Sequence, residues 1–315
     1  MLKDSQPTLS FCRPIEAYIG LGYHRSLDEL DRDHCEKHGL PIIRRRIGGG
    51  PVYIDDQQLF FQLTMPAAVA PARVDLLYRR FLGPAIDAFR DIGLAAELRS
   101  ANDIAVDERK ISGTGAGRIG DGVTVVGNVI FSFPHHRMVE ALALPSNRMA
   151  DECLRLMQRH VSSLAGEGVS NTTSEEVKQI LTRRYAQDLD LEPQVSELTT
   201  VEQIEVERWS QRFADPEWME GPATPRASGR RIRISADAWL WSTSDANLEL
   251  EASIARGRIE WLHLESISLN GTGGEICEAL VGRAADPAQV GGRLRRFGPQ
   301  GLHVARLLEP GLKQQ

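Results

Sequence analysis

Cysteine is scarce in this 315-residue chain, and its four cysteines form no C-x-x-C pair. Cys12, Cys35, Cys153 and Cys277 are widely separated, which argues against a disulfide framework and against a zinc site. Reduced thiols in a cytoplasmic protein are the simplest interpretation. Nothing near Cys35 in the sequence would lower its pKa, so it is interpreted as a core residue and not as a nucleophile.

Long apolar runs and an excess of positive charge are also absent. No apolar run approaches the about 20 residues that a membrane span needs, and the opening MLKDSQPTLSF lacks the apolar segment of a signal peptide. The net charge of -6 argues against a general nucleic-acid binder. The length allows one large domain or a large and a small one, and we expect a monomer.

Residues 41–63, PIIRRRIGGGPVYIDDQQLFFQL, form the first candidate site. Arg44–Arg46 precede Gly48–Gly50, and two β-prone runs follow, Val52–Ile54 and Leu59–Leu63. Glycine lets backbone N–H groups approach a ligand without a Cβ in the way, and arginine grips phosphate with two parallel hydrogen bonds. The pattern predicts a loop that closes over an anionic ligand; a flexible hinge with solvated arginines is the alternative.

The second candidate site lies within residues 99–133. Asn102–Asp103 precede a short apolar run, and Lys110–Gly113 open a segment rich in glycine. Ser112 and Gly113 favour a phosphate site around Lys110, and the glycine-rich segment 113–122 is predicted to be a mobile lid. A solvated lysine on a strand is the alternative. The glycines lead into a strand, so they are not the dinucleotide fingerprint, and no G-x-x-x-x-G-K-[ST] loop occurs.

The remaining patterns predict helices and a second domain. Helices are expected over 26–37, 73–93, 148–164, from a capping box at Thr173 and Glu176 to about 188, and over 202–213. His135 and His136 have no second cluster at metal-ligand spacing, so a metal site there is not favoured. The predicted domains are 1–220 (catalytic), 221–230 (linker) and 231–315 (accessory). The accessory domain is expected to hold strands at 231–235, 238–242, 247–255 and 259–268, then helices at 274–281 and 286–296.

Two motifs carry a family resemblance. RRRIGGGPVYIDDQQLFF resembles the signature of the lipoate–protein ligase A family, usually R-R-x-S-G-G-G-A-V-(aromatic)-H-D. NDIAVDERKISGTG resembles the family's second motif, in which N-D-(apolar) leads to K-(I/V)-S-G-(S/T). The C-terminal segment resembles the family's accessory domain. The resemblance implies an α+β fold of the biotin/lipoate ligase-like (class II synthetase-like) kind, a mixed sheet with packed helices, plus a small α+β accessory domain.

The resemblance also implies a two-step reaction. Lipoate (or octanoate) and ATP with Mg²⁺ give an acyl-AMP and pyrophosphate, and the acyl group then passes to a lysine of a lipoyl carrier protein. The carrier belongs to a 2-oxoacid dehydrogenase, to a glycine-cleavage system or to a specialised pathway. Neither nucleic acid nor membrane is implied as a partner.

Site residues carry over position by position. Lys110 would touch both the lipoyl carbonyl and the α-phosphate, and Arg45 would contact phosphate. The segment that would wrap the nucleotide comprises Gly48, Gly49, Gly50, Pro51, Val52 and Tyr53, joined by Ser112 and Gly113. Asn102 and Asp103 would lie on the adenylate or metal side, with Asp103 as a ligand of the Mg²⁺ that accompanies ATP.

Three positions depart from the family pattern: Ile47 replaces serine, Pro51 replaces alanine and Ile54 replaces histidine. Pro51 has no N–H, so the loop loses one backbone donor. Family members usually carry a strand and a helix ahead of Arg13–Gly22, and we expect the natural chain to begin upstream.

Other functions remain open from the sequence. An acyl transferase of the same fold, which needs no ATP, generally lacks the accessory domain, so residues 221–315 favour the ligase. A non-catalytic paralogue that binds lipoate or its carrier is suggested by the three departures and opposed by Lys110. Biotin ligase is disfavoured because the chain has no G-R-G-R-x-x-R loop.

Overall fold

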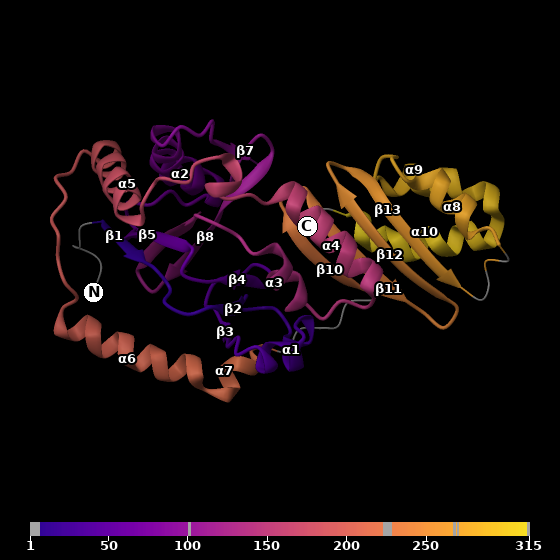
Figure 1. The fold of residues 1–315 in the computed structure, drawn as a ribbon, viewed down its shortest axis with the longest axis horizontal. Coiled ribbons are helices and arrows are strands. Elements are labelled where there is room, and N and C mark those ends of the chain that lie inside the picture. Colours follow the sequence, from indigo (N-terminus) through magenta and orange to yellow (C-terminus); the bar gives the residue numbers. More distant parts are fainter. Residues whose placement is uncertain (1–6, 100–101, 223–228, 267–268, 270, 314–315) are drawn as a thin grey trace. The chain divides into compact units, whose positions relative to one another are not determined.

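The computed structural model describes residues 7–99, 102–222, 229–266, 269 and 271–313. The chain divides into two compact units, and helix α4 (Asn147–His160) groups with the second. The first unit comprises residues 1–143 and 161–223, and the second comprises 144–160 and 224–315 (Figure 1). Each unit is described by itself below.

The larger sheet of the first unit has six strands among the described residues, in the order β1-β5-β9-β8-β7-β6. Every neighbouring pair is antiparallel. The strands are β1 (Thr8–Cys12), β5 (Gln58–Pro66), β6 (Glu97–Arg99), β7 (Asp103–Val106), β8 (Arg109–Ile119) and β9 (Gly122–Ile130). A smaller mixed sheet pairs β2 (Tyr18–Leu21) parallel with β3 (Ile42–Arg44) and antiparallel with β4 (Val52–Ile54).

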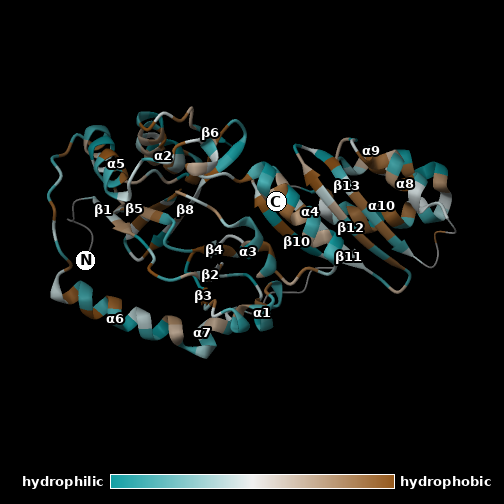
Figure 2. Ribbon diagram, viewed as in Figure 1, coloured by the Kyte–Doolittle hydropathy of each residue, from teal (hydrophilic) through white to brown (hydrophobic). Residues whose placement is uncertain are grey.

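The core of the first unit lies between the larger sheet and two helices, α2 (Val74–Asp91) and α5 (Ser174–Leu189). Alternate residues of β5 are buried on the helix side, because side chains of a strand point to opposite faces in turn. Figure 2 shows hydrophobic colouring along β5. The Tyr185 hydroxyl of α5 donates to the Phe81 carbonyl of α2 at 2.8 Å, which fixes the two helices together.

Short helices complete the first unit. They are η1 (Leu27–Glu29), α1 (Arg32–Lys37), α3 (His135–Glu140), η2 (Ala165–Glu167), α6 (Thr200–Ala214) and α7 (Pro216–Glu220). The helix expected over 26–37 is interrupted: Ser26 caps η1, and Asp31 caps α1 separately. Cys35 is buried, as predicted for a core residue. The predicted capping box at Thr173 and Glu176 begins α5.

The glycine-rich segment after Lys110 is a strand, which corrects the expectation of a lid. Strand β8 runs from Arg109 to Ile119 and pairs with β9 from Thr114 onward, and Gly120 at φ +58° begins the hairpin turn. Glycine weakens a strand without forbidding it, and β9 is rich in valine, a residue that favours strands. The apolar partner strand therefore outweighs the glycines.

The second unit is a four-stranded antiparallel sheet, ordered β10-β11-β12-β13 among the described residues. Its elements are β10 (Arg230–Ser235), β11 (Ala238–Ser244), β12 (Leu248–Ala255), β13 (Arg258–Ser266), α8 (Gly273–Leu280), α9 (Pro287–Leu294), η3 (Arg295–Phe297) and α10 (Gly298–Leu312). The four strands and first two helices lie close to the predicted positions. Helix α10 was not predicted, because glycine and proline interrupt its sequence.

Helix α4 marks a difference from the predicted domain boundary, which placed it in the catalytic domain. The Glu152 carboxylate on α4 accepts a hydrogen bond from the Ser253 hydroxyl of β12. Arg159, also on α4, reaches Glu260 of β13 at 2.8 Å. These polar contacts attach α4 to the sheet of the second unit. Residues 223–228 of the predicted linker lie outside the described residues.

No helix in the part of the chain that the structure describes combines the length and the apolar character needed to cross a membrane.

Candidate anion-binding site of the first unit

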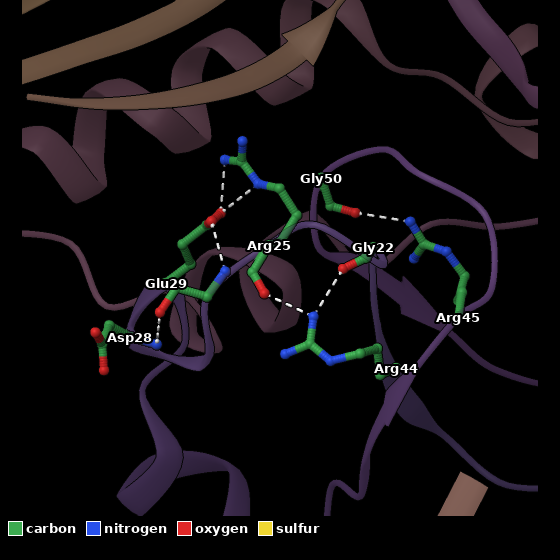
Figure 3. Close-up of polar contacts among 8 residues, drawn as sticks. Gly22, Arg25, Asp28, Glu29, Arg44, Arg45 and Gly50 are labelled. Atoms are coloured by element: carbon green, nitrogen blue, oxygen red, sulfur yellow. Dashed lines mark hydrogen bonds and ion pairs between the residues drawn. The ribbon is translucent and has the colours of Figure 1, made fainter. Parts of the chain in front are cut away.

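The three adjacent arginines have three different environments. Arg44 at the end of β3 is fully buried, and burial lowers the pKa of its guanidinium. That guanidinium donates to five carbonyls of the described residues, those of Gly22, Tyr23, Arg25, Met219 and Glu220. Figure 3 shows it between the Gly22 and Arg25 carbonyls. Arg44 therefore ties α7 to the turn after β2, which is a structural role.

Arg45 shapes the glycine loop. Its guanidinium donates to the Gly20 carbonyl of β2, to the Gly48 carbonyl at 3.3 Å and to the Gly50 carbonyl at 2.9 Å. Burial lowers the pKa of Arg45 to about 10. Arginine carries five N–H donors, so the Nε donor and one on Nη1 remain for a ligand.

Arg46 points elsewhere. Its guanidinium carbon lies 4.1 Å from the centre of the Trp209 ring on α6, a cation–π contact. Of the three arginines, Arg44 therefore stabilises the fold, Arg45 shapes the glycine loop and Arg46 lies at the surface.

The loop turns its carbonyls inward and its N–H groups outward. The Ile47 carbonyl accepts from the Tyr23 N–H at 3.1 Å, while the Gly48 and Gly50 carbonyls face Arg45. A trans peptide directs its C=O and the following N–H to opposite sides. The N–H groups of Gly48 and Gly49 thus point away from β2 and Arg45, and the described residues offer them no acceptor.

Two glycines make this loop conformation possible. A Cβ on Gly22 would lie 1.9 Å from the Gly49 carbonyl oxygen, so the end of β2 must be glycine there. Gly49 has φ +104°, which an L side chain rarely adopts. The Gly49 carbonyl thus lies against Gly22, and the Gly50 N–H points the other way. Successive N–H groups that face outward form a concave site for an anion.

Ile47 brings the two sequence motifs together. Its Cδ1 lies 3.3 Å from the position that a Cβ on Gly115 would occupy, and its Cγ2 lies 3.6 Å from that of Gly117. The loop therefore covers the glycine stretch of β8. The isoleucine that replaces the family's serine packs on β8, the strand that contains Lys110.

Lys110 is held by an ion pair and by its backbone. Its Nζ lies 2.8 Å from the Asp103 carboxylate of β7, which is 4% exposed, while the Lys110 side chain is 25% exposed. The Ser162 N–H donates to the Lys110 carbonyl at 2.8 Å. A charge pair this sheltered from water is screened less than one on the surface, so Asp103 fixes the position of the Lys110 amino group.

Two other predicted site residues have contrasting surroundings. The Ser112 hydroxyl is completely buried and has no hydrogen-bond partner among the described residues. Such an orphan needs an explanation, and because the hydroxyl is closed off from solvent, a ligand bound at the surface of the site does not supply one. The Asn102 amide instead donates to the Thr114 carbonyl at 3.0 Å, and the Thr114 hydroxyl donates back to the Asn102 carbonyl. Asn102 therefore joins the start of β7 to β8.

Asn128 on β9 and Gln58 on β5 were missed from the sequence. The Asn128 oxygen accepts from the Gly113 N–H at 2.7 Å, and its NH₂ donates to the Gln58 oxygen at 2.9 Å. The Gln58 NH₂ donates to the Tyr53 carbonyl at 3.0 Å. The sequence does show an amide side chain within each of two mostly apolar strands, and a buried amide needs hydrogen-bond partners.

A bound Mg²⁺ would need carboxylate ligands from the site. Among the residues that the structure describes, no group of three His, Cys, Asp or Glu side chains could hold a metal ion. His135 instead contacts the Val161 carbonyl at 3.0 Å. Mg²⁺ is commonly bound by one or two carboxylates together with substrate phosphates. Asp103 fits such a nucleotide-borne ion as a single carboxylate, although it is already paired with Lys110.

The fold and site together define an α+β protein with a glycine loop that packs on the strand of an ion-paired lysine. Residues 1–186 match the family model of the lipoyl protein ligase A/B catalytic domain. This match covers more than half of the chain, which belongs to that family.

Curated relatives include both ligases and transferases. The chain is 27% identical over 160 residues to lipoate-protein ligase LplJ of Bacillus subtilis, covering 50% of this chain and 47% of that protein. It is 23% identical over 229 residues to lipoate-protein ligase A subunit 1 of Thermoplasma acidophilum, covering 69% and 85%. It is 21% identical over 239 residues to octanoyltransferase LipM of Geobacillus kaustophilus, covering 67% and 86%. The match to LplJ spans about half of that relative's length.

Solved structures establish the same fold. The bipartite lipoate protein ligase of Thermoplasma acidophilum, described with its E2 lipoyl domain, gives a TM-score of 0.65 at 20% identity over 71% of this chain and 88% of that one. A lipoate-protein ligase A bound with ATP gives 0.60 at 21% identity, covering 70% and 88%. LipL1 of P. falciparum in complex with lipoate gives 0.56 at 16% identity, covering 98% and 88%.

Proposed function

We propose that this protein is an ATP-dependent lipoate–protein ligase, which activates lipoate or octanoate as an acyl-AMP and transfers the acyl group to a lysine of a lipoyl carrier protein. The observation that carries the proposal is that one strand, β8, bears an ion-paired lysine and also contacts the loop whose backbone donors point outward. Lys110 stands on the strand that the Gly48–Gly50 loop covers through Ile47. Both are groups that stabilise negative charge.

The first step places the greater demand on the site. A carboxylate oxygen of lipoate attacks the α-phosphorus of ATP, and the bond to pyrophosphate breaks. Negative charge builds on the phosphoryl oxygens, so the residues contribute mainly by positioning and by charge stabilisation. Lys110 and the outward N–H groups of the loop can supply both, and Arg45 holds the loop in shape through the Gly48 and Gly50 carbonyls.

Further groups bind the nucleotide in this proposal. Gly50 to Tyr53 follow the nucleotide, and Ser112 and Gly113 lie on the phosphate side. Mg²⁺, when bound with ATP, would add positive charge at the phosphates, with Asp103 as the carboxylate that would hold it.

In the second step the carrier lysine must arrive unprotonated. Its amine attacks the acyl carbonyl, the amide bond forms and the bond to AMP breaks. Lys110 stabilises charge on the carbonyl oxygen. AMP is a good leaving group, so this step needs little beyond placement of the two reactants.

The match to LipM favours one alternative, an acyl transfer between carriers without ATP. Transfer through a cysteine thioester would require a reactive thiolate. Burial raises the pKa of Cys35, and it raises the pKa of Cys153 to about 12. Both thiols are therefore poor nucleophiles, whereas Cys12 is exposed at the end of β1 and is the candidate thiol for this transferase.

The test is the intact mass of apo carrier domains after incubation with the protein, lipoate and Mg·ATP. The panel should include carriers of 2-oxoacid dehydrogenases, of glycine cleavage and of specialised pathways. A gain of one lipoyl group that requires ATP and is lost in Lys110→Ala supports the ligase. Transfer from an acylated donor carrier without ATP supports the transferase instead. Absence of lipoate-dependent AMP formation and of any carrier acylation overturns both.

A further inference from the structure

A chain of buried hydrogen bonds connects the two motifs of the candidate site. It runs from the Gly113 N–H through Asn128 and Gln58 to the Tyr53 carbonyl. Asn128 is 7% exposed and Gln58 is 2% exposed, so water does not substitute for these bonds. Tyr53 lies three residues after the glycine loop, and Gly113 lies three residues after Lys110. These hydrogen bonds therefore connect the segment of Lys110 and Gly113 with the strand that follows the glycine loop.

The ends of this chain fix the orientation of both amides. A backbone N–H can only donate, so Asn128 must present its oxygen to Gly113 and its NH₂ to Gln58. A backbone carbonyl can only accept, so Gln58 must present its NH₂ to Tyr53. A flip of either amide would place two acceptors or two donors together. Only one orientation of the two amides therefore satisfies every hydrogen bond in this series.

We propose that Asn128 and Gln58 are positioning residues, which hold the segment of Lys110 and Gly113 at a set distance from the strand that follows the glycine loop. The assignment rests on the proposed ligase function. Neither amide acts on the reacting atoms. Lys110 Nζ lies 3.7 Å from the point that a Cβ on Gly113 would occupy, so a shift of Gly113 also moves the surroundings of the ammonium.

The experiment compares Asn128→Leu, Gln58→Leu and the double variant in the full chain. The readouts are lipoate-dependent exchange of pyrophosphate into ATP, resolved into kcat and KM, and the midpoint of thermal unfolding. Each single variant leaves two buried polar groups unsatisfied and should lower the midpoint. The double variant also leaves two, the Gly113 N–H and the Tyr53 carbonyl, so its midpoint should stay close to those of the single variants.

Activity is measured at a temperature at which every variant is folded. A misplaced site costs on the order of 100-fold in rate, so we expect kcat to fall roughly 10- to 100-fold in both single variants and to stay low in the double variant. Gln62→Leu is the matched control, because Gln62 lies on the same strand β5 with an exposed amide. It should leave kcat unchanged.

An unchanged kcat in the double variant, despite its lower unfolding midpoint, would overturn the positioning role and leave only a structural one. Single variants with wild-type kcat would also overturn it. If the wild type itself shows no lipoate-dependent exchange, the proposed ligase fails and the positioning role falls with it. The wild-type measurement thus separates the two failures.

Discussion

Lys110 and Asp103 form an ion pair of 2.8 Å in which the acid is almost completely buried and the lysine is partly exposed. The ammonium of Lys110 therefore stays accessible to a ligand, while the buried carboxylate of Asp103 fixes its position. A cation held in this way does not have to be ordered when the substrate binds, which is the basis of electrostatic preorganisation.

Lys110→Ala tests this preorganisation. Removal of one such donor typically costs about 3 kcal/mol of barrier, so acyl-adenylate formation should fall roughly 100-fold or more. The unfolding midpoint should also fall, because Asp103 loses the cation at 2.8 Å. Pyrophosphate exchange and thermal unfolding are the measurements. Lys178→Ala, at a surface pair on α5, is the control and should change neither.

The double variant Lys110→Ala with Asp103→Asn separates the two effects. It removes the buried charge along with its partner, so the unfolding midpoint should rise relative to Lys110→Ala while exchange stays low. An exchange rate that recovers along with stability would contradict a direct role of the lysine.

The arginine triplet predicts three different phenotypes. Arg44→Ala leaves several buried carbonyls without a donor and should cost about 3 kcal/mol or more in the free energy of unfolding. Arg46→Ala removes one exposed cation–π contact, worth about 0.5–1 kcal/mol, and should leave activity intact. Arg45→Ala should raise the KM for ATP most, because it loosens the Gly48–Gly50 loop. Denaturant unfolding and steady-state kinetics on the three variants check the order.

The sequence was most informative where a residue type has a local consequence. The capping residues of α5 and the four strands of the second unit follow from short-range patterns, and the structure confirms these elements. The glycine loop was located from its composition. The inward direction of its carbonyls was not, because it depends on Arg45 and on the close approach of Gly22.

Long-range partners explain what the sequence left out. The arginine triplet reads as a single basic cluster, and only the contacts with α7 and Trp209 separate Arg44 from Arg46. Asn128 and Gln58 are 70 positions apart and meet only through the pairing of β5 with β9. The segment 113–122 was predicted to be a lid because its glycines favour flexibility and its pairing with the valine-rich strand that follows was not foreseen.

Pro51→Ala should strengthen nucleotide binding. The substitution restores an N–H to a peptide whose carbonyl faces Arg45, so the new donor points outward like those of the preceding glycines. A hydrogen bond worth about 1 kcal/mol would lower the KM for ATP about 5-fold. Loss of the proline should cost up to about 1 kcal/mol of stability through the unfolded chain. Pro71→Ala controls for that cost. An unchanged KM would show that this peptide does not face the nucleotide.

His160→Gln should remove part of the pH dependence of stability. His160 is buried at the end of α4, and its Nε2 has no hydrogen-bond partner within the described residues. Burial lowers the pKa of His160 below its usual value; the neighbouring Asp237 and Glu260 oppose the shift, and Arg256 and Arg159 add to it.

Because the folded protein binds this proton less readily than the unfolded chain, the neutral His160 contributes stability above the unfolded pKa of about 6.5. That contribution is lost as the pH falls from there toward the lower pKa of the folded state. Urea unfolding between pH 5 and 8 should therefore show a free energy that declines more steeply at acid pH in the wild type than in His160→Gln. His136→Gln, at an exposed site, is the control and should follow the wild type. Identical slopes for the wild type and His160→Gln would mean that this histidine titrates alike in both states.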